Sequence, residues 1–328
     1  MTLRIYITRR LPQPAHDRLR EAGFQTEVYP EDRPAPHEVL LQAARVADGM
    51  ICTLADRIDR EVLEQAEQLK IIANYAVGFN NIDMPEADRR GIAVTNTPGV
   101  LTEASADLTW ALLMAAARRI VESDSFLRAG KFQGWGPLHF LGQDLMRRTL
   151  GIVGLGRIGK AVAWRATGFQ MRVRYFSRHR DDDFEIGYPQ EAKWVPLDSL
   201  LQTSDFVSLH VPYKPETHHL IGERELRLMQ PHAILINTSR GAVVDEAALV
   251  KALKEQWIWG AGLDVYEEEP KVHPGLIGLP NAVLCPHIAS ATIETRTRMG
   301  LMAADNLIAF FAGKLPPNLV NQEVWKKS

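Results

Sequence analysis

Short apolar runs alternate with amphipathic stretches along most of the chain, and this alternation is typical of α/β proteins with parallel sheets. In the first hundred residues the apolar runs predict strands at Leu3–Thr8, Gln25–Tyr29, Gly49–Cys52, Lys70–Asn74 and Ile92–Asn96. The amphipathic stretches between them predict helices at Pro14–Ala22, Pro36–Ala47, Asp59–Gln68 and Met84–Arg90.

The pattern is interrupted at Thr97-Pro98-Gly99. One long helix is expected next, from about Glu103 to Gly130, with Thr102 as its N-cap, and segment 134–137 is expected to be a loop. A second alternating series starts at Thr149. It predicts the six mostly parallel strands of a complete dinucleotide-binding domain, at Leu150–Val153, Met171–Phe176, Phe206–His210, Ala233–Asn237, Ala261–Val265 and Ala282–Cys285. From Ala289 we expect one helix and a polar tail, which must dock onto another part of the chain.

Length and composition narrow the class of protein. At about 150 residues per domain, 328 residues favour two domains. The 46% apolar and 24% charged residues are ordinary for a globular protein, and a net charge of −2 provides no basic field for nucleic acid. Cys52 and Cys285 are too few for a disulfide framework and lie in apolar runs, so we expect buried, reduced thiols in a cytoplasmic protein.

The sequence also argues against a membrane partner. The first ten residues contain no continuous apolar stretch of the kind found in signal peptides. The longest apolar run, Leu108–Ala117, is about half as long as a membrane helix. We therefore expect neither a membrane nor a nucleic acid as partner.

A glycine-rich segment, Gly154-Leu155-Gly156-Arg157-Ile158-Gly159, follows the strand predicted at Leu150–Val153 and opens a predicted helix. This strand–turn–helix context is what distinguishes a dinucleotide fingerprint from a chance match. Gly154 permits a tight turn, Gly156 lets the backbone approach a pyrophosphate, and Gly159 lets the helix pack closely on the strand. The helix N-terminus offers free N–H groups to the phosphates. The alternative is a glycine turn without a ligand.

The segment Ser177-Arg178-His179-Arg180 follows the next predicted strand, where NAD-binding domains carry an acidic residue for the ribose hydroxyl. Arginine and a hydroxyl at this place favour a 2′-phosphate, and therefore NADP(H). The alternative is a solvated basic turn balanced by Asp181-Asp182-Asp183.

Three chemically suitable residues follow predicted strands, where open α/β sheets bind ligands: Arg240, Glu269 and His287. Reduction of a keto acid requires a cation for the carboxylate, a proton for the carbonyl oxygen, and a carboxylate that orients the proton donor. Arginine, histidine and glutamate fill these roles in turn. Taken singly, each residue has a more ordinary interpretation as a surface charge, a structural histidine or a solvated turn. Their joint placement favours an acid–base site.

Other polar and aromatic residues are less informative. Asp264, at the end of its predicted strand, either bonds the nicotinamide or caps the turn. His218 and His219 have no acidic or cysteine partner at ligand spacing, so we predict no metal site. Trp257 and Trp259 are expected in the core.

Several motifs together resemble those of the D-isomer-specific 2-hydroxyacid dehydrogenases, most closely the glyoxylate/hydroxypyruvate reductases. The similarity covers nearly the whole chain, and it is carried by Asn74–Asp83, Asn96–Thr102, Gly151–Gly159, Asn237–Gly241, Gly262–Pro270 and Pro286–Ala291. Ser177-Arg178 departs from the acidic residue of the NAD-preferring members.

The resemblance implies two Rossmann-like domains with the active site in the cleft between them. A dinucleotide-binding domain, 99–288, would be inserted into a discontinuous substrate domain, 1–98 and 289–328. A homodimer would form largely through the dinucleotide domains, with the helix Glu103–Gly130 as an inter-domain and dimer element.

The resemblance also implies site residues. Arg240, Glu269 and His287 would form the catalytic triad. The backbone amides of Val77 and Gly78 would hold the substrate carboxylate beside Arg240, with Leu54 near the substrate. Cofactor contacts are implied at Thr102, Gly154, Leu155, Gly156, Arg157, Ile158, Gly159, Ser177, Arg178, His179, Val211, Pro212, Thr238, Ser239, Asp264 and Ser290.

We therefore expect an enzyme that reduces glyoxylate or hydroxypyruvate to glycolate or D-glycerate, with NADPH preferred and NADH possible. Other members of the same family, namely phosphoglycerate, D-lactate or phosphite dehydrogenases, are alternatives within the enzyme class. A dinucleotide-sensing corepressor is the alternative outside it. Turnover of keto acids distinguishes an enzyme from a sensor.

Overall fold

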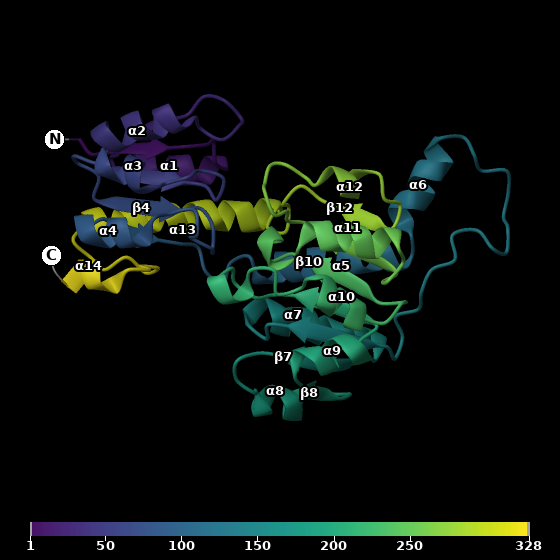
Figure 1. Cartoon of the computed structure of the whole chain (residues 1–328). Helices are drawn as coiled ribbons and strands as arrows, with labels where there is room; N and C mark the ends of the chain where they lie inside the picture. Colours follow the sequence, from purple (N-terminus) through teal and green to yellow (C-terminus); the bar gives the residue numbers. More distant parts are fainter. Residues whose placement is uncertain (1, 327–328) are drawn as a thin grey trace. The chain divides into compact units, whose positions relative to one another are not determined.

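The protein is described by a computed structural model that covers residues 2–326. Within that range the chain forms two compact units (Figure 1). Unit 1 comprises the residues up to Leu101 and those from Ser290, and unit 2 comprises Thr102–Ala289. Each unit is built on one sheet in which every paired strand is parallel to its neighbour, so the predicted α/β class with two parallel sheets is confirmed.

The sheet of unit 1 has the strand order β2-β1-β3-β4-β5 among the described residues. Its strands are β1 (Arg4–Ile7), β2 (Gln25–Val28), β3 (Gly49–Cys52), β4 (Ile71–Asn74) and β5 (Ala93–Thr95). Its helices are α1 (Gln13–Glu21), α2 (His37–Val46), α3 (Arg60–Glu64), α4 (Met84–Arg90), α13 (Ile293–Phe311) and α14 (Gln322–Lys326). Because helices cover both faces, β3 and β4 are buried at every position.

The C-terminal segment docks onto unit 1, as a segment too short for a domain must. Helix α13 packs against α1 and β4. The residues after it run beside β5, where the Val320 N–H donates to the Val94 carbonyl at 2.8 Å. The polar tail predicted there contains a further short helix, α14, which the sequence pattern did not indicate.

The sheet of unit 2 has the order β12-β11-β10-β9-β6-β7-β8 in the part of the chain that the structure describes. Its strands are β6 (Thr149–Val153), β7 (Arg172–Phe176), β8 (Ala192–Trp194), β9 (Phe206–Leu209), β10 (Ile234–Asn237), β11 (Gly260–Leu263) and β12 (Ala282–Leu284). The prediction of six strands missed β8, a three-residue edge strand paired with β7. β6 is buried throughout, as a central strand between two helical layers must be.

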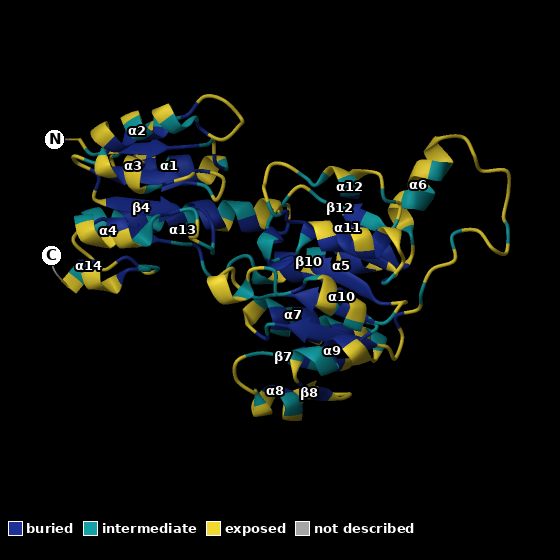
Figure 2. Ribbon diagram, viewed as in Figure 1, coloured by how far each residue is buried: buried dark blue, intermediate teal, exposed yellow. Residues whose placement is uncertain are grey.

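Helices pack on both faces of the unit 2 sheet, and Figure 2 shows the strands as the buried layer between them. On one face lie α5 (Thr102–Ala117) and α7 (Arg157–Arg165), which share a core with Leu150, Ile152 and Ile236. On the other lie α9 (Leu197–Thr203), α10 (Glu223–Leu228) and α11 (Glu246–Lys254), around Val207 and Leu235. The remaining helical segments are α6 (Ile120–Arg128), α8 (Asp182–Gly187), α12 (Pro274–Ile277), η1 (Ala166–Phe169), η2 (Pro215–Thr217) and η3 (Gly241–Val243).

The long helix predicted at Glu103–Gly130 is wrong, because the chain breaks it into α5 and α6. Arg119 adopts a left-handed conformation, with φ of 52°, between the two helices and forms an ion pair with Glu122 at 2.7 Å. Thr102, predicted as the N-cap, is instead the first residue of α5. Helix α6 and the segment after it form an extension of unit 2 that we call the arm, residues 120–146 (Figure 1).

Two expectations about the core are only partly met. Cys52 is buried, whereas Cys285 is half-buried because it follows the edge strand β12. Trp257 is half-buried beneath the Arg227 guanidinium, but Trp259 is exposed and does not belong to the core.

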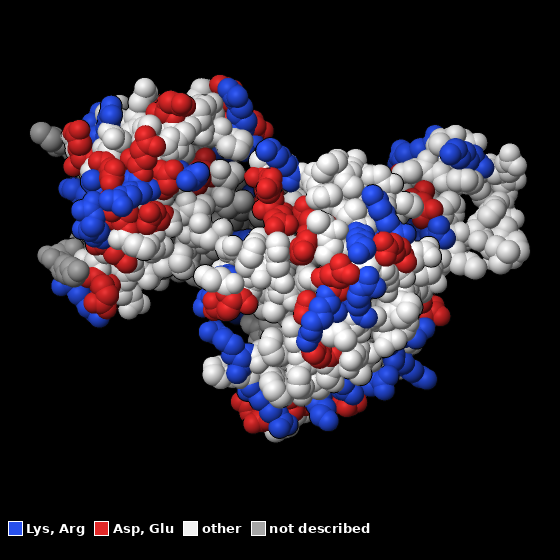
Figure 3. All heavy atoms as spheres, viewed as in Figure 1, with Lys and Arg blue, Asp and Glu red and all other residues white. Residues whose placement is uncertain are grey.

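None of the helices formed by residues 2–326 is long and apolar enough to cross a membrane. On the face shown in Figure 3, acidic and basic side chains are interspersed over each unit.

Candidate active site

Three adjacent strands of unit 2 carry the predicted triad on the loops that follow them. Arg240 follows β10, Glu269 follows β11 and His287 follows β12, and these strands are neighbours in the sheet. Since the carboxyl ends of parallel strands meet at one edge, side chains distant in sequence converge there.

His287 and Glu269 form a direct pair. The His287 Nδ1 lies 2.8 Å from Glu269 Oε2, and the Tyr266 N–H donates to Glu269 Oε1 at 3.0 Å. Burial raises the pKa of Glu269, but the hydrogen bond and charge of His287, the Tyr266 N–H and the charge of Arg240 outweigh it and hold that pKa below its ordinary value. Glu269 is therefore a carboxylate at neutral pH. Because it occupies Nδ1, Nε2 is the nitrogen of His287 that can face a substrate.

Arg240 is held by the turn in which it lies. The Asn237 side chain donates to the Arg240 carbonyl at 2.9 Å and accepts from the N–H and hydroxyl of Ser239, which closes the turn after β10. Burial lowers the pKa of Arg240, and the charge of Glu269 raises it in part. The guanidinium remains charged at neutral pH, because an arginine pKa starts so high.

Asp264 caps the turn that presents His287. Its buried carboxylate accepts the N–H groups of Ile288 at 2.7 Å and Ala289 at 2.8 Å, and its carbonyl accepts the His287 N–H at 2.9 Å. Burial raises the pKa of Asp264 despite these bonds. Since His287 has a φ of 54°, this cap fixes a backbone conformation that L-residues seldom adopt. Asp264 therefore caps the turn, which is one of the two roles expected for it.

The glycine loop between β6 and α7 is shaped for close backbone contact. A Cβ on Gly159 would lie 2.2 Å from the Gly154 carbonyl oxygen, and Gly154 itself has a φ of 100°. By contrast, a Cβ on Gly156 would meet nothing within 4 Å, and α7 has no side-chain cap at its N-terminus. The N-terminus of α7 thus has no side-chain cap and has open space at Gly156 beside a tightly packed turn, which fits a pyrophosphate.

The two arginines of the basic segment after β7 differ in their partners among the described residues. Arg180 forms ion pairs with Asp182 at 2.8 Å and Glu185 at 2.6 Å, and Asp181 pairs with Lys160. Arg178 is exposed and forms no ion pair with any residue in the described range 2–326. The Ser177 hydroxyl donates to the His179 carbonyl. Asp182 and Glu185 thus neutralise Arg180, whereas Arg178 is available to an anion.

Unit 1 carries a second group of predicted residues at the carboxyl edge of its own sheet. The Val77 carbonyl accepts from the Asn96 side chain at 2.8 Å, and the Gly78 carbonyl accepts from the Asn74 side chain at 2.7 Å. Among the described residues, neither the Val77 nor the Gly78 N–H donates a hydrogen bond. Both N–H groups are therefore available to an anion. Leu54, on the turn after β3, is also exposed.

Asn74 and Asn96, which the sequence reasoning missed, fix this loop. The only signal for them was an asparagine at the end of a predicted strand, which is equally typical of any turn.

The remaining predicted cofactor residues occupy loops or the first turn of α7 at the same edge of unit 2, apart from Thr102 on α5 and Ser290, where the chain returns to unit 1. Arg157 and Ile158 open α7, and Val211 and Pro212 follow β9. The Leu155 side chain is buried in the core, so only its backbone faces the loop. The Thr238 hydroxyl lies 2.8 Å from that of Thr109.

His219 has an acidic partner that sequence spacing did not reveal. Its Nε2 lies 2.5 Å from Glu267 Oε1, although 48 residues separate the two. No group of three potential metal ligands occurs in the described part of the chain.

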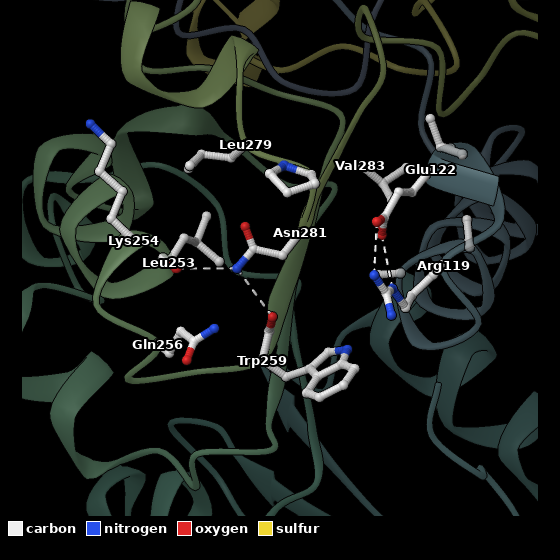
Figure 4. Close-up of a pocket in the computed structure, with 13 residues that line it drawn as sticks. Arg119, Glu122, Leu253, Lys254, Gln256, Trp259, Leu279, Asn281 and Val283 are labelled. Atoms are coloured by element: carbon white, nitrogen blue, oxygen red, sulfur yellow. Dashed lines mark hydrogen bonds and ion pairs between the residues drawn. The ribbon is translucent and has the colours of Figure 1, made fainter. Parts of the chain in front are cut away.

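A separate pocket of about 500 Å³ lies at the opposite edge of the unit 2 sheet (Figure 4). Trp259 and Asn281, which precede β11 and β12, line it, and the Asn281 side chain donates to the Trp259 carbonyl at 3.2 Å. The Arg119–Glu122 pair at the base of the arm lies across from them. This pocket is therefore distinct from the strand ends that carry the triad.

The parallel sheet, the glycine loop and the His287–Glu269 pair are together typical of a nucleotide-binding oxidoreductase. The chain belongs to the D-isomer specific 2-hydroxyacid dehydrogenase family, since the model of that family's NAD-binding domain matches residues 110–289. The predictions of this family and of an oxidoreductase that uses a nicotinamide dinucleotide are thus confirmed.

Full-length relatives agree with this assignment. The chain is 54% identical to the glyoxylate reductase of Thermococcus gammatolerans, over 99% of this chain and 98% of that protein. It is equally similar to the glyoxylate reductase of Korarchaeum cryptofilum, over 99% of this chain and 98% of the relative.

Solved structures superpose on nearly the whole chain. A Thermus thermophilus protein matches with a TM-score of 0.91 and 48% identity, over 97% of this chain and all of the other. An NADPH-dependent glyoxylate/hydroxypyruvate reductase from Sinorhizobium meliloti, in complex with NADP and malonate, matches with a TM-score of 0.86 and 34% identity over 98% of each chain.

Proposed function

We propose that this protein reduces glyoxylate or hydroxypyruvate, giving glycolate or D-glycerate, with NADPH as the preferred cofactor. The observation that carries the proposal is the His287–Glu269 pair, which lies with Arg240 on the ends of three neighbouring strands. The names of the relatives support the choice of substrate.

Each member of the triad has a distinct task in this reaction. Arg240 holds the substrate carboxylate through its two-pronged guanidinium. His287 carries a proton on Nε2 and donates it to the carbonyl oxygen as negative charge develops there. Glu269 is bonded to Nδ1, and this bond fixes the orientation of the ring. When bound, the nicotinamide supplies the hydride.

We assign the proposed functions to two domains of the chain. Residues 99–288 would form the dinucleotide-binding domain, and residues 1–98 with 289–328 the substrate domain. These proposed bounds lie within three residues of the limits of unit 2 and unit 1. The N–H groups of Val77 and Gly78 donate no hydrogen bond among the described residues, so they can donate to a carboxylate. Asn74 and Asn96 hold the loop in place by donating to the carbonyls of the same two residues.

The residues that would hold the cofactor are those of the glycine loop and the segment after β7. Gly154, Gly156 and Gly159 would admit the pyrophosphate to the N-terminus of α7. Ser177 and Arg178 would contact the 2′-phosphate, and the unpaired state of Arg178 within residues 2–326 supports a preference for NADPH. The free thiols of Cys52 and Cys285 suit a reducing compartment such as the cytoplasm.

We infer a homodimer that forms through unit 2, because the arm exposes a series of large apolar side chains. Trp135 is 86% exposed and Leu138 77% exposed, and they are accompanied by Ile120, Val121, Leu127, Phe132, Leu141 and Met146. Exposed apolar clusters of this kind mark protein interfaces. The arm packs on itself through Phe126 and Phe140, whose ring centroids are 5.1 Å apart, so it presents these side chains from an ordered segment.

A substrate panel tests the proposed function. The purified protein is assayed with glyoxylate, hydroxypyruvate, pyruvate and phosphohydroxypyruvate for oxidation of NADPH and NADH, and with phosphite for reduction of NAD(P)⁺. We expect the highest kcat/KM for glyoxylate or hydroxypyruvate with NADPH. A higher kcat/KM for another substrate would reassign the enzyme within its family. Cofactor binding with only marginal turnover of every substrate would favour the sensor instead.

A further inference from the structure

Two chain segments that carry catalytic residues touch each other backbone to backbone. A Cβ on Gly241, the residue after Arg240, would lie 1.8 Å from the Tyr266 carbonyl carbon and 2.4 Å from the Glu267 nitrogen. No side chain fits between them. The segment that contains Arg240 is therefore set directly against the segment that leads to Glu269.

Glu267 anchors the second segment through both its side chain and its backbone. Its carboxylate lies 2.5 Å from His219 Nε2, and its N–H donates to Glu246 Oε1 at 2.7 Å. The Glu246 N–H returns a longer bond of 3.4 Å to Glu267 Oε2. Glu246 is buried at the start of α11, so this contact ties the loop to a helix of the core.

His219 is itself fixed in place. Its N–H donates to the Ala242 carbonyl at 2.8 Å, and its φ of 48° turns the chain where it meets segment 242–244. Ile221 then pairs with Val244 in a short parallel bridge. The imidazole thus reaches Glu267 from the same stretch of chain that follows Arg240.

Tyr266 connects this anchor to the acid–base pair. Its N–H donates to Glu269 Oε1 at 3.0 Å, and its hydroxyl donates to the Cys285 carbonyl at 2.9 Å, two residues before His287. A shift of Tyr266 would therefore move Glu269 and the His287 turn together. Displacements of about 1 Å at such a site can cost about 100-fold in rate.

The neighbouring glutamate shows that this arrangement is not a general property of the acidic turn. Glu268 is exposed, and its side chain has no hydrogen-bond or ion-pair partner among residues 2–326. Glu267 is 28% exposed at its side chain and has the partners described above. Three consecutive glutamates thus have three different environments: Glu267 in the anchor, Glu268 in solvent and Glu269 in the acid–base pair.

We propose that Glu267 and His219 are positioning residues for the reduction. Their hydrogen bond, with the Glu246 contact, holds segment 266–269 so that Glu269 meets His287 beside Arg240. The effect on rate rests on the proposed function, whereas the effect on the His287–Glu269 hydrogen bond does not.

Four variants test this proposal: Glu267→Ala, Glu267→Gln, His219→Ala and the double variant His219→Ala/Glu267→Ala. Glu268→Ala is the matched control on the same turn. For each we measure kcat and KM for glyoxylate, the Kd for NADPH, and the melting temperature. Glu267→Ala and His219→Ala should lower kcat by about 10- to 100-fold, with the Kd for NADPH changed less than about twofold, because the glycine loop is untouched.

Rescue and non-additivity separate positioning from general stability. Glu267→Gln keeps an oxygen that accepts a hydrogen bond from His219, so it should retain kcat within about threefold of the unmodified protein. The double variant should be no slower than the worse single variant, because both remove the same contact. A kcat for Glu267→Ala within about twofold of that of the control Glu268→Ala would overturn the proposal. A loss of kcat that is proportional to the fall in melting temperature, and that Glu267→Gln does not restore, would also overturn it.

A measurement that needs no turnover keeps the test independent of the proposed function. Nitrogen NMR of the His287 imidazole reports the hydrogen bond at Nδ1. We expect that signal to shift in Glu267→Ala and to stay in place in Glu267→Gln and Glu268→Ala. If the unmodified protein reduces no keto acid and Glu267→Ala still shifts the His287 signal, the proposed function is refuted and the positioning role stands. An unchanged signal in Glu267→Ala would refute the positioning role.

Discussion

Arg178 and Arg180 lie two residues apart after β7, but they differ in their ion-pair partners. Arg180 is neutralised by Asp182 and Glu185, whereas Arg178 has no ion-pair partner in the described chain. A 2′-phosphate carries nearly two negative charges, and hydrogen bonds to charged groups contribute about 1.5–3 kcal/mol. Arg178 is therefore the cation on which cofactor choice depends.

Replacement of Arg178 should weaken the preference for NADPH. We expect Arg178→Ala to lower the ratio of kcat/KM for NADPH to that for NADH by about tenfold to a hundredfold, while Arg180→Ala, the matched control, changes it by less. Ser177→Asp with Arg178→Ile should reverse the preference through KM. Added salt should erode the preference of the unmodified protein, because Arg178 is exposed. Steady-state assays with both cofactors measure these ratios, and equal values for the unmodified protein would show that this segment is an ordinary solvated turn.

The three residues of the predicted triad could be proposed from sequence because each follows an apolar run that ends in a polar turn. Such runs are visible along the chain without knowledge of the third dimension. The pairing of His219 with Glu267 could not be found in this way, because it joins loops that are 48 residues apart. The roles of Asn74 and Asn96 could not be found from sequence either. Their side chains bond the carbonyls of Gly78 and Val77 only because the ends of two strands lie beside that loop.

Helix α7 lies very close to the glycine loop at Gly159. A methyl group there would lie 2.2 Å from the Gly154 carbonyl oxygen, so the helix would have to move away from the loop that is proposed to bind the pyrophosphate. Gly168 provides the contrast, since a Cβ on it would meet nothing within 4 Å and its φ is not in the left-handed region.

Gly159→Ala should therefore destabilise the protein by about 1–3 kcal/mol, as overpacking in a close contact does. The Kd for NADPH should rise at least about tenfold with it, because the helix N-terminus and the loop separate. Gly168→Ala should leave both quantities nearly unchanged. Denaturant unfolding and fluorescence titration with NADPH provide the two readouts. A Kd for Gly159→Ala equal to that of Gly168→Ala would exclude this loop from cofactor binding.

Elements with long apolar or amphipathic patterns were predicted well, and short or interrupted ones were not. The strands β6, β9 and β10 are buried at every position, so their apolar runs are unambiguous. β8 was missed because it has three residues and carries Lys193 at an exposed edge. The break between α5 and α6 was missed because Arg119 takes a left-handed conformation that its residue type does not announce.

The complete chain combines two parallel sheets, and the arm is the part of unit 2 with the largest exposed apolar content. A monomer that left Trp135 and Leu138 in water would be prone to association. The prediction of a homodimer came from family resemblance, because nothing in the hydrophobic pattern of the arm distinguishes it from a loop.

Polar replacements in the arm should shift the protein from dimer to monomer. We expect Trp135→Ser with Leu138→Ser to do so without loss of the fold, because both side chains project into solvent within one chain. Ile186→Ser is the control, since Ile186 is 84% exposed on α8, away from the arm. Light scattering coupled to size-exclusion chromatography measures the mass. An unmodified protein that elutes as a monomer would contradict the inferred dimer.

We propose that His287, paired with Glu269, donates the proton in keto acid reduction. The most direct measurement is the kcat of His287→Ala with glyoxylate and NADPH, together with the Kd for NADPH. His232→Ala is the control, because His232 also pairs with a carboxylate, Asp205 at 2.8 Å, but precedes β10 at the opposite edge of the sheet. We expect a loss of about 10²–10⁴-fold in kcat for His287→Ala, with the Kd for NADPH nearly unchanged and full activity in the control. Turnover by His287→Ala close to that of the unmodified protein would contradict it.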